Sequence, residues 1–170
     1  MLKNLSSAVV PRHIYRIECF GPDGKLKWVD ECQNLVVNVG LDEILDKFWK
    51  GSSYSASFFV GLTDGTPTVA AGDTMSSHAG WAEVTTYSES NRQTLTLGSV
   101  SWQSVDNSAS KASFSISGSA TVGGAFIATN NSKGGTTGIL IGAAAFSGGD
   151  KSVGSGDTLN VTCTLTASSS

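Results

Sequence analysis

The chain has 170 residues and a mass of 17.5 kDa, which is the size of a single domain. Only 15% of its residues are charged and its net charge is −3, so we expect no nucleic-acid partner, because binding a phosphate backbone requires a surplus of Lys and Arg. No segment approaches the roughly 20 consecutive apolar residues that span a bilayer, so we expect no membrane partner, and no signal peptide is visible at the start.

The charged residues are unevenly distributed along the chain. Residues 1–50 hold 14 of the 25 charged side chains, whereas residues 51–170 hold the other 11 and are rich in Ser, Thr and Gly. The parts that we expect are an N-terminal arm over 1–12 and a single β-sandwich domain over 13–170, in which 13–51 form a hairpin and a helix and 52–170 form Ser/Thr/Gly-rich strands.

A turn sequence lies early in the domain. Gly-Pro-Asp-Gly (21–24) separates two segments that are typical of strands, and a proline fixes φ in such a turn. We therefore expect a β-hairpin, whose register places Cys19 and Cys32 too far apart for a disulfide bond. The expected pairs are Phe20 with Lys25, Cys19 with Leu26 and Cys32 with His13.

One segment has the periodicity of an amphipathic helix, over about 40–50. Acidic residues near its start, basic residues near its end and Gly51 after it all suit a helix. A helix this short is marginal alone, so we expect its apolar stripe to pack against the sheets. The stripe consists of Leu41, Ile44, Leu45, Phe48 and Trp49.

Alternation with period two dominates the rest of the chain. In 157–166, Leu159, Val161, Cys163 and Leu165 fall on one face, and Thr or Asn falls on the other. About eight such short strands separated by turn residues favour a mainly β fold, an antiparallel β-sandwich or jelly roll. The other expected strands are 58–62, 82–87, 94–97, 100–102, 113–117 (with Phe114 and Ile116 inward), 120–128 and 137–146.

The chain offers few residues for catalysis or metal binding. Cys19, Cys32 and Cys163 lack the paired spacing of a zinc site, so we expect three free thiols, with disulfides between subunits as the open alternative. His78 has Ser and Asp nearby in the sequence, but neighbours in a polar loop rarely form a triad, and we expect it to hold a turn. We therefore expect no catalytic, cofactor-binding or metal-binding residues.

The four tryptophans are candidates for binding sugars by stacking. Single tryptophans on strands and helices are more often anchors of a core or an interface, and this is the role that we expect. They are Trp28, Trp49, Trp81 and Trp102.

Six runs of the sequence carry a resemblance to a known class. They are Asn34–Leu45, Val60–Met75, Ser77–Val84, Tyr87–Arg92, Phe146–Lys151 and Ser155–Val161. Together they resemble small virion proteins of tailed bacteriophages, over most of the chain from about residue 13 onward.

The resemblance implies a structural protein of the virion and not an enzyme. It is strongest to head decoration (cement) proteins, which are similar to jelly rolls and clamp neighbouring major capsid proteins from outside. The implied partners are the major capsid protein and further copies of this chain, with no cofactor. The implied location is the capsid exterior, after synthesis in the bacterial host cytoplasm. A tail-fibre or receptor-binding protein, or a neck or collar component, remains an alternative.

Overall fold

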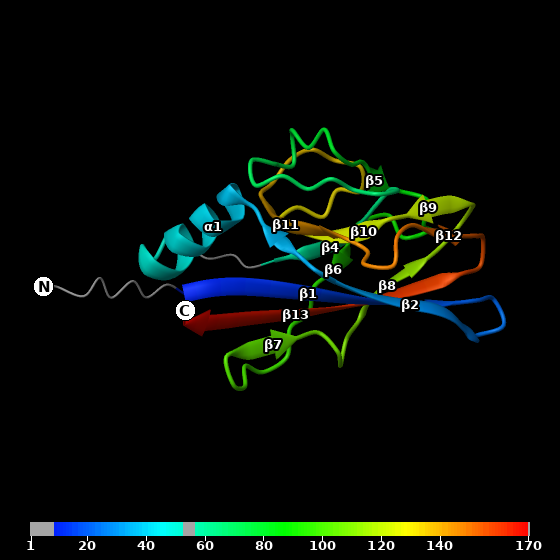
Figure 1. Ribbon diagram of the computed structural model, residues 1–170, viewed down its shortest axis with the longest axis horizontal. Coiled ribbons are helices and arrows are strands. Elements are labelled where there is room, and N and C mark those ends of the chain that lie inside the picture. The colour runs from blue at the N-terminus through cyan, green and yellow to red at the C-terminus, as the bar shows by residue number, and fades with distance from the viewer. Residues whose placement is uncertain (1–8, 53–56, 170) are drawn as a thin grey trace, which may run out of the picture.

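The computed structural model describes residues 9–52 and 57–169, and these form two antiparallel sheets packed face to face with one short helix (Figure 1). The fold is mainly β, as the alternation predicted, and is that of a β-sandwich. β1 begins and β13 ends on the same side of the molecule as the helix, while the turn between β1 and β2 lies at the opposite side (Figure 1).

Each layer of the sandwich is one antiparallel sheet, and in each sheet one strand has two short strands beside it. The first sheet has the order β2 (Leu26–Gln33), β1 (Val9–Phe20), β13 (Thr158–Ser169), with β7 (Ser104–Asp106) and β8 (Ala112–Ser115) both beside β13. The second sheet has the order β3 (Leu35–Val36), β11 (Leu140–Ala145), β10 (Gly124–Ala128), β4 (Phe59–Thr63), with β5 (Glu83–Val84) and β6 (Gln93–Thr94) both beside β4. A separate two-stranded ribbon joins β9 (Ala120–Val122) and β12 (Lys151–Val153).

The hairpin is present, but its predicted register is wrong. The turn occupies Gly21 to Lys25, where the Gly21 N–H donates to the Lys25 carbonyl, so pairing begins one residue later than expected. A bulge between Cys19 and Phe20 then shifts the register again. The observed pairs are Phe20 with Leu26, Cys19 with Trp28 and Cys32 with Tyr15.

All three cysteines are free thiols in the structure, as predicted, and all are buried. Burial raises the pKa of Cys19 to about 11 and that of Cys32 to about 12, so both remain protonated at neutral pH. Cys163 lies in the sandwich core, as its place in the apolar alternation predicted.

The last four residues of the expected N-terminal arm belong to a strand instead. Residues 9–12 are the first residues of β1 and pair with β13 in register, from Val9 opposite Ser169 to Arg12 opposite Thr166. The rest of the expected arm, 1–8, lies outside the described residues. Pro11 is accommodated because the β2 partner of β1 ends at Ile14, and so no neighbouring strand needs an N–H from Pro11.

The main core lies between the two sheets and uses the predicted alternation. Leu159, Val161, Phe114 and Ile116 are buried there, as expected. Four expected strands differ from the prediction. The expected strand 82–87 is only Glu83–Val84 (β5), and 94–97 overlaps β6 (Gln93–Thr94) at Thr94 alone. The segment 120–128 divides at Gly123 into β9 and β10, and 100–102 is not a strand.

A second, smaller core covers the outer face of the second sheet. The loop over 64–82 folds back over this face and contributes Met75 and Trp81 (Figure 1). Because both faces of β10 are covered, its residues form a continuous small or apolar run in place of an alternation. In β4, Gly61 lies opposite Phe126, whose ring occupies the space where a Cβ would be.

Candidate functional site

The helix does not bury its apolar stripe. α1 (Asn38–Ile44) continues into a wider π-helical turn, η1 (Leu45–Trp49), in which the Lys50 N–H donates to the Leu45 carbonyl five residues back. Leu45 is 55% exposed, Phe48 75% and Trp49 73%. The prediction that this stripe packs against the sheets is therefore wrong.

The reason lies in how the helix contacts β11. Gly40 is the buried residue of α1, and a Cβ there would lie 2.3 Å from the Ile141 carbonyl oxygen. The helix backbone therefore rests directly on the second sheet at its first turn. The apolar stripe faces sideways, over the ends of β1 and β13, instead of down onto the sheet.

An apolar groove of about 620 Å³ runs between the helix and the ends of the first sheet. One wall is helical, with Leu41, Leu45 and Trp49, and the opposite wall is formed by Val100 and Val105. The floor consists of residues at the free ends of β1 and β13, namely Val9, Pro11, Leu165 and Ala167.

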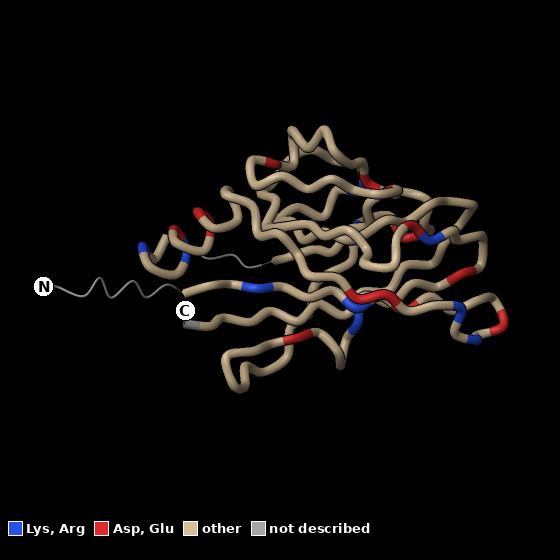
Figure 2. The backbone as a smooth tube through the Cα atoms, in the orientation of Figure 1, with Lys and Arg blue, Asp and Glu red and all other residues tan. Residues whose placement is uncertain are grey.

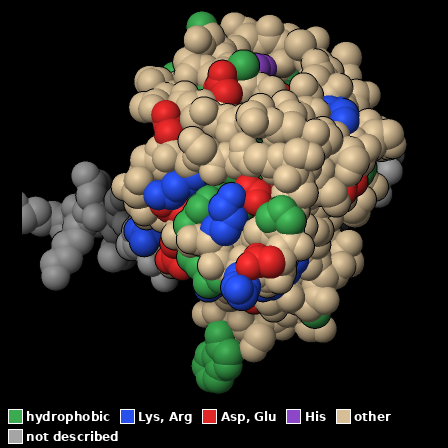
Figure 3. All heavy atoms as spheres, turned by 90° about the vertical axis from the view of Figure 1, so that its right-hand side faces the viewer, with side chains coloured by type: hydrophobic (Ala, Val, Ile, Leu, Met, Phe, Trp, Pro, Cys, Tyr) green, Lys and Arg blue, Asp and Glu red, His purple; other side chains and the backbone are tan. Residues whose placement is uncertain are grey.

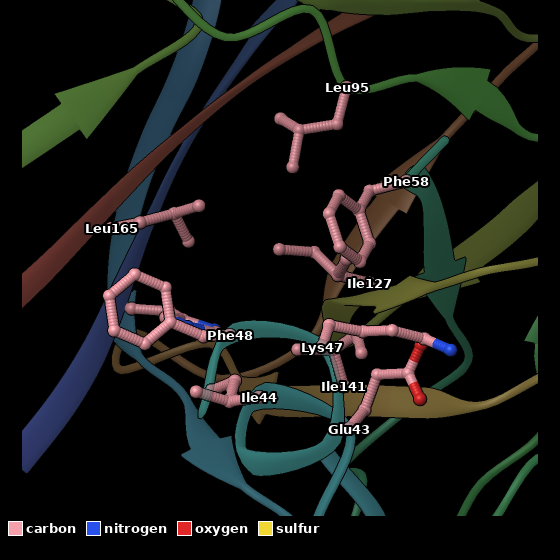
Figure 4. Close-up of a pocket in the computed structure, with 10 residues that line it drawn as sticks. Glu43, Ile44, Lys47, Phe48, Phe58, Leu95, Ile127, Ile141 and Leu165 are labelled. Atoms are coloured by element: carbon pink, nitrogen blue, oxygen red, sulfur yellow. The ribbon is translucent and has the colours of Figure 1, made fainter. Parts of the chain in front are cut away.

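Beside the groove lies an apolar pocket of about 490 Å³, at the open end of the sandwich (Figure 4). Its walls come from both sheets and from the helix: Phe58, Leu95, Ile127, Ile141, Leu165, Ile44 and Phe48. Two charged side chains, Glu43 and Lys47, also line it, and Figure 4 shows their ends pointing away from the apolar ring. The pocket can therefore accept an uncharged, apolar group.

His13 lines both the groove and the pocket and is held neutral. Its Nδ1 lies 2.9 Å from Asn34 Nδ2, and because an amide nitrogen only donates, His13 Nδ1 is the acceptor. The same Asn34 amide donates to the Tyr15 hydroxyl at 2.6 Å. Burial lowers the pKa of His13 to about 4, so the imidazole adds no charge to the apolar surface at neutral pH.

A hairpin beside the groove carries the most exposed large apolar side chain of the described residues. In this Trp102 hairpin (residues 98–106), Ser101 and Ser104 exchange backbone hydrogen bonds of 2.9 and 3.0 Å across a two-residue turn. Trp102 and Gln103 both have positive φ, 50° and 57°, and Trp102 is 91% exposed. Of the two roles expected for Trp102, an anchor of a core or of an interface, its exposure excludes the core, and the expected strand 100–102 is replaced by this turn.

The opposite end of the molecule has a different character. Figure 3 shows Lys, Arg, Asp and Glu side chains gathered around the β1–β2 turn, and Figure 2 shows how few lie along most of the second sheet. Several of them form ion pairs: Arg16 and Lys111 with Glu18, Lys27 with Asp157, and Lys25 with Asp23. We call this turn end the charged end. We call the opposite end the apolar end, because the apolar groove and pocket open there, beside the charged residues that the helix itself carries (Figure 2).

His78 and Asp73 line neither the groove nor the pocket. His78 stacks on Trp81 with ring centroids 3.8 Å apart, and its Nδ1 lies 2.9 Å from the Trp81 carbonyl oxygen, so it holds a turn as predicted. Asp73 accepts hydrogen bonds from Trp81 Nε1 and the Ala70 N–H. Among the described residues, no group of three or more His, Cys, Asp or Glu side chains is placed to hold a metal ion.

The tryptophans divide between core and surface. Trp81 belongs to the outer core and Trp28 packs edge-on against Phe146, whereas Trp49 and Trp102 are exposed at the apolar end. No helix within 9–52 or 57–169 is long and apolar enough to cross a bilayer.

The groove and the pocket were not predicted from the sequence. The sequence shows the apolar stripe of the helix, but periodicity indicates only that a face is apolar and not what covers it. One further signal was present: residues 93–105 contain no charged side chain and include Trp102.

Comparison of the chain with models of known families, with curated proteins and with solved structures finds no match.

Proposed function

We propose that this protein is a structural component of a tailed-bacteriophage particle, which binds the outside of the capsid and stabilises contacts between major capsid protein subunits. Its partners are then the major capsid protein and further copies of itself. Its location is the capsid exterior, after synthesis in the bacterial host cytoplasm. The resemblance of the six sequence runs supports the lineage, and with it a jelly-roll arrangement of the sandwich.

The apolar groove is the observation that carries the proposed role. A face with Phe48, Trp49 and Val100 each at least 73% exposed is costly to leave in water, and large exposed apolar patches mark interaction surfaces. The surrounding Ser- and Thr-rich surface loses little hydration energy when a neighbour covers it, because removing water from a hydroxyl costs far less than removing it from a charge. Many weak contacts repeated over a shell then add to strong binding.

Copy number tests the proposal most directly. A stained gel of purified virions, calibrated against the major capsid protein, is expected to show hundreds of copies per particle. A few to a few tens of copies would instead place the protein in the tail, neck or collar.

Virions that lack the protein are expected to lose DNA at a lower temperature than intact ones, and equal resistance to heat would contradict the role.

Binding to capsids tests the groove itself. Purified protein is added to capsids that lack it, and the bound fraction is measured by sedimentation. Leu45→Asp is expected to abolish binding, because it places a charge in the groove wall. Leu26→Asp is the matched control, since Leu26 is similarly exposed, at 53%, but lies beside the turn at the charged end. Equal binding by the two variants would exclude the groove as the contact.

A receptor- or glycan-binding appendage is the second candidate. Trp102 supports it, because an indole exposed on a hairpin tip can stack on a sugar ring. Low copy number, a trimer in solution and loss of cell binding in Trp102→Ala virions would favour this candidate over the capsid role.

A further inference from the structure

The apolar end of the molecule carries both a projecting aromatic side chain and a recess that fits one. Trp102 projects from the tip of the Trp102 hairpin, 91% exposed. The apolar pocket of about 490 Å³ opens at the same end and is walled by aliphatic and aromatic side chains from both sheets. A pocket of this size has room for an indole ring and the backbone beside it.

We propose that Trp102 of one copy of the chain inserts into the apolar pocket of a second copy, and that the contact is repeated so that the assembly closes. We thereby specify the self-association that the proposed function includes, and purified protein without virions is sufficient to measure it. Every copy presents one hairpin and one pocket. A closed symmetric oligomer therefore fills every pocket, whereas an open row of copies leaves one hairpin and one pocket uncovered at its ends.

The chemistry of the two surfaces matches. The segment 93–105, which leads into and forms most of the Trp102 hairpin, has no charged side chain, so insertion requires no charge to lose its water. The pocket presents apolar side chains inward, and its charges, Glu43 and Lys47, are of opposite sign and point away from the apolar ring (Figure 4). Ser and Gln beside Trp102 can form hydrogen bonds at the rim of the interface.

The geometry of the hairpin indicates that Trp102 enters the pocket of a second copy and not the pocket of its own chain. The root of the hairpin, Val100 and Val105, forms a wall of the groove in its own chain. The turn at the tip is closed by the reciprocal Ser101–Ser104 hydrogen bonds and carries Trp102 away from that wall, into solvent.

The turn is also conformationally costly in isolation. Two-residue turns of this kind favour Asn-Gly, because both central residues need positive φ, yet here they are Trp and Gln. A large aromatic side chain held in such a conformation and left in water has no stabilising role within its own chain. A contact made by Trp102 with another molecule explains why the indole occupies this position.

The test measures the mass of the protein in solution by light scattering, over micromolar to millimolar concentrations. Wild type is expected to associate, and Trp102→Ala and Ile44→Lys are each expected to weaken association at least tenfold. Ile44→Lys blocks the pocket from the helix side, and Phe48→Lys replaces it if Ile44→Lys fails to fold. Leu26→Ser at the charged end is the matched control and is expected to associate like wild type.

Mixing variants separates this contact from a general apolar interaction. Trp102→Ala retains the pocket and Ile44→Lys retains the indole, so an equimolar mixture is expected to associate more strongly than either variant alone. Circular dichroism and urea unfolding establish that each variant is folded. A wild type that stays monomeric, a Trp102→Ala variant that associates like wild type, or a mixture no more associated than its components would each overturn the proposal.

Discussion

Arg92 and Glu83 form a buried, bidentate ion pair. Arg92 Nε donates to Glu83 Oε1 at 3.0 Å and Arg92 Nη2 donates to Oε2 at 2.7 Å, with side-chain exposures of 0% and 7%. Two further guanidinium N–H groups donate to the Asn130 carbonyl at 2.8 Å and to the Gly135 carbonyl at 2.6 Å. The pair therefore ties the loop after β10 to β5, on the sheet edge away from the groove.

Removing Arg92 is expected to destabilise the fold strongly. Arg92→Ala leaves the Glu83 carboxylate buried and unpaired, which costs about 3 to 5 kcal/mol. Arg16→Ala is the control, because Arg16 is 43% exposed and its pair with Glu18 is worth at most about 1 kcal/mol. Urea unfolding of the two variants measures the difference, and similar losses for both would show that the buried pair contributes no more than a surface pair.

His13 makes the stability depend on pH. Its pKa is about 4 when folded and about 6.5 when unfolded, so only the unfolded chain takes up this proton between those values. As pH falls from about 6.5 to about 4, this residue is expected to remove about 3 kcal/mol from the free energy of unfolding, and nothing further below that range.

His13→Gln isolates that contribution. The Gln amide oxygen can accept the Asn34 hydrogen bond but does not titrate. Urea unfolding at a series of pH values is expected to show wild type losing more stability than the variant on acidification. Parallel curves for the two proteins would show that His13 is not held neutral by the fold.

Gly61 is expected to tolerate no side chain. A Cβ there would lie 2.2 Å from the Phe126 ring, which is fully buried, so Gly61→Ala forces the ring to move and costs about 1 to 3 kcal/mol. Gly72→Ala is the matched control, because a Cβ at Gly72 meets nothing within 4 Å, and a change within about 0.5 kcal/mol is expected. The thermal unfolding midpoints of both variants measure the difference. An unchanged midpoint for Gly61→Ala would contradict the close packing.

The Trp102 hairpin is expected to become more stable when its turn is made conventional. Replacing Trp102-Gln103 with Asn-Gly supplies residues that adopt positive φ readily, and is expected to raise the free energy of unfolding by about 1 to 2 kcal/mol. Urea unfolding measures this at low protein concentration, where association does not contribute. A loss of stability would mean that Trp102 supports its own chain, against the role proposed for it.

The sequence alone determined the class of fold. Leu159, Val161 and Cys163 alternate with polar residues, and a half-buried strand is the conformation that places every second side chain in a core. The buried thiols and the turn role of His78 followed from the same local chemistry. The helix was also found, because a 3.6-residue repeat of apolar side chains is a local property of the chain.

Tertiary structure alone decided which apolar faces are covered. The close contact of Gly40 with Ile141 turns the helix sideways, so the stripe that contains Phe48 and Trp49 faces solvent instead of a sheet. The hairpin register likewise depended on a bulge that no local pattern showed. Periodicity records that a side chain is apolar, whereas its exposure depends on which distant segment lies against it, and that is set only when the sheets pack.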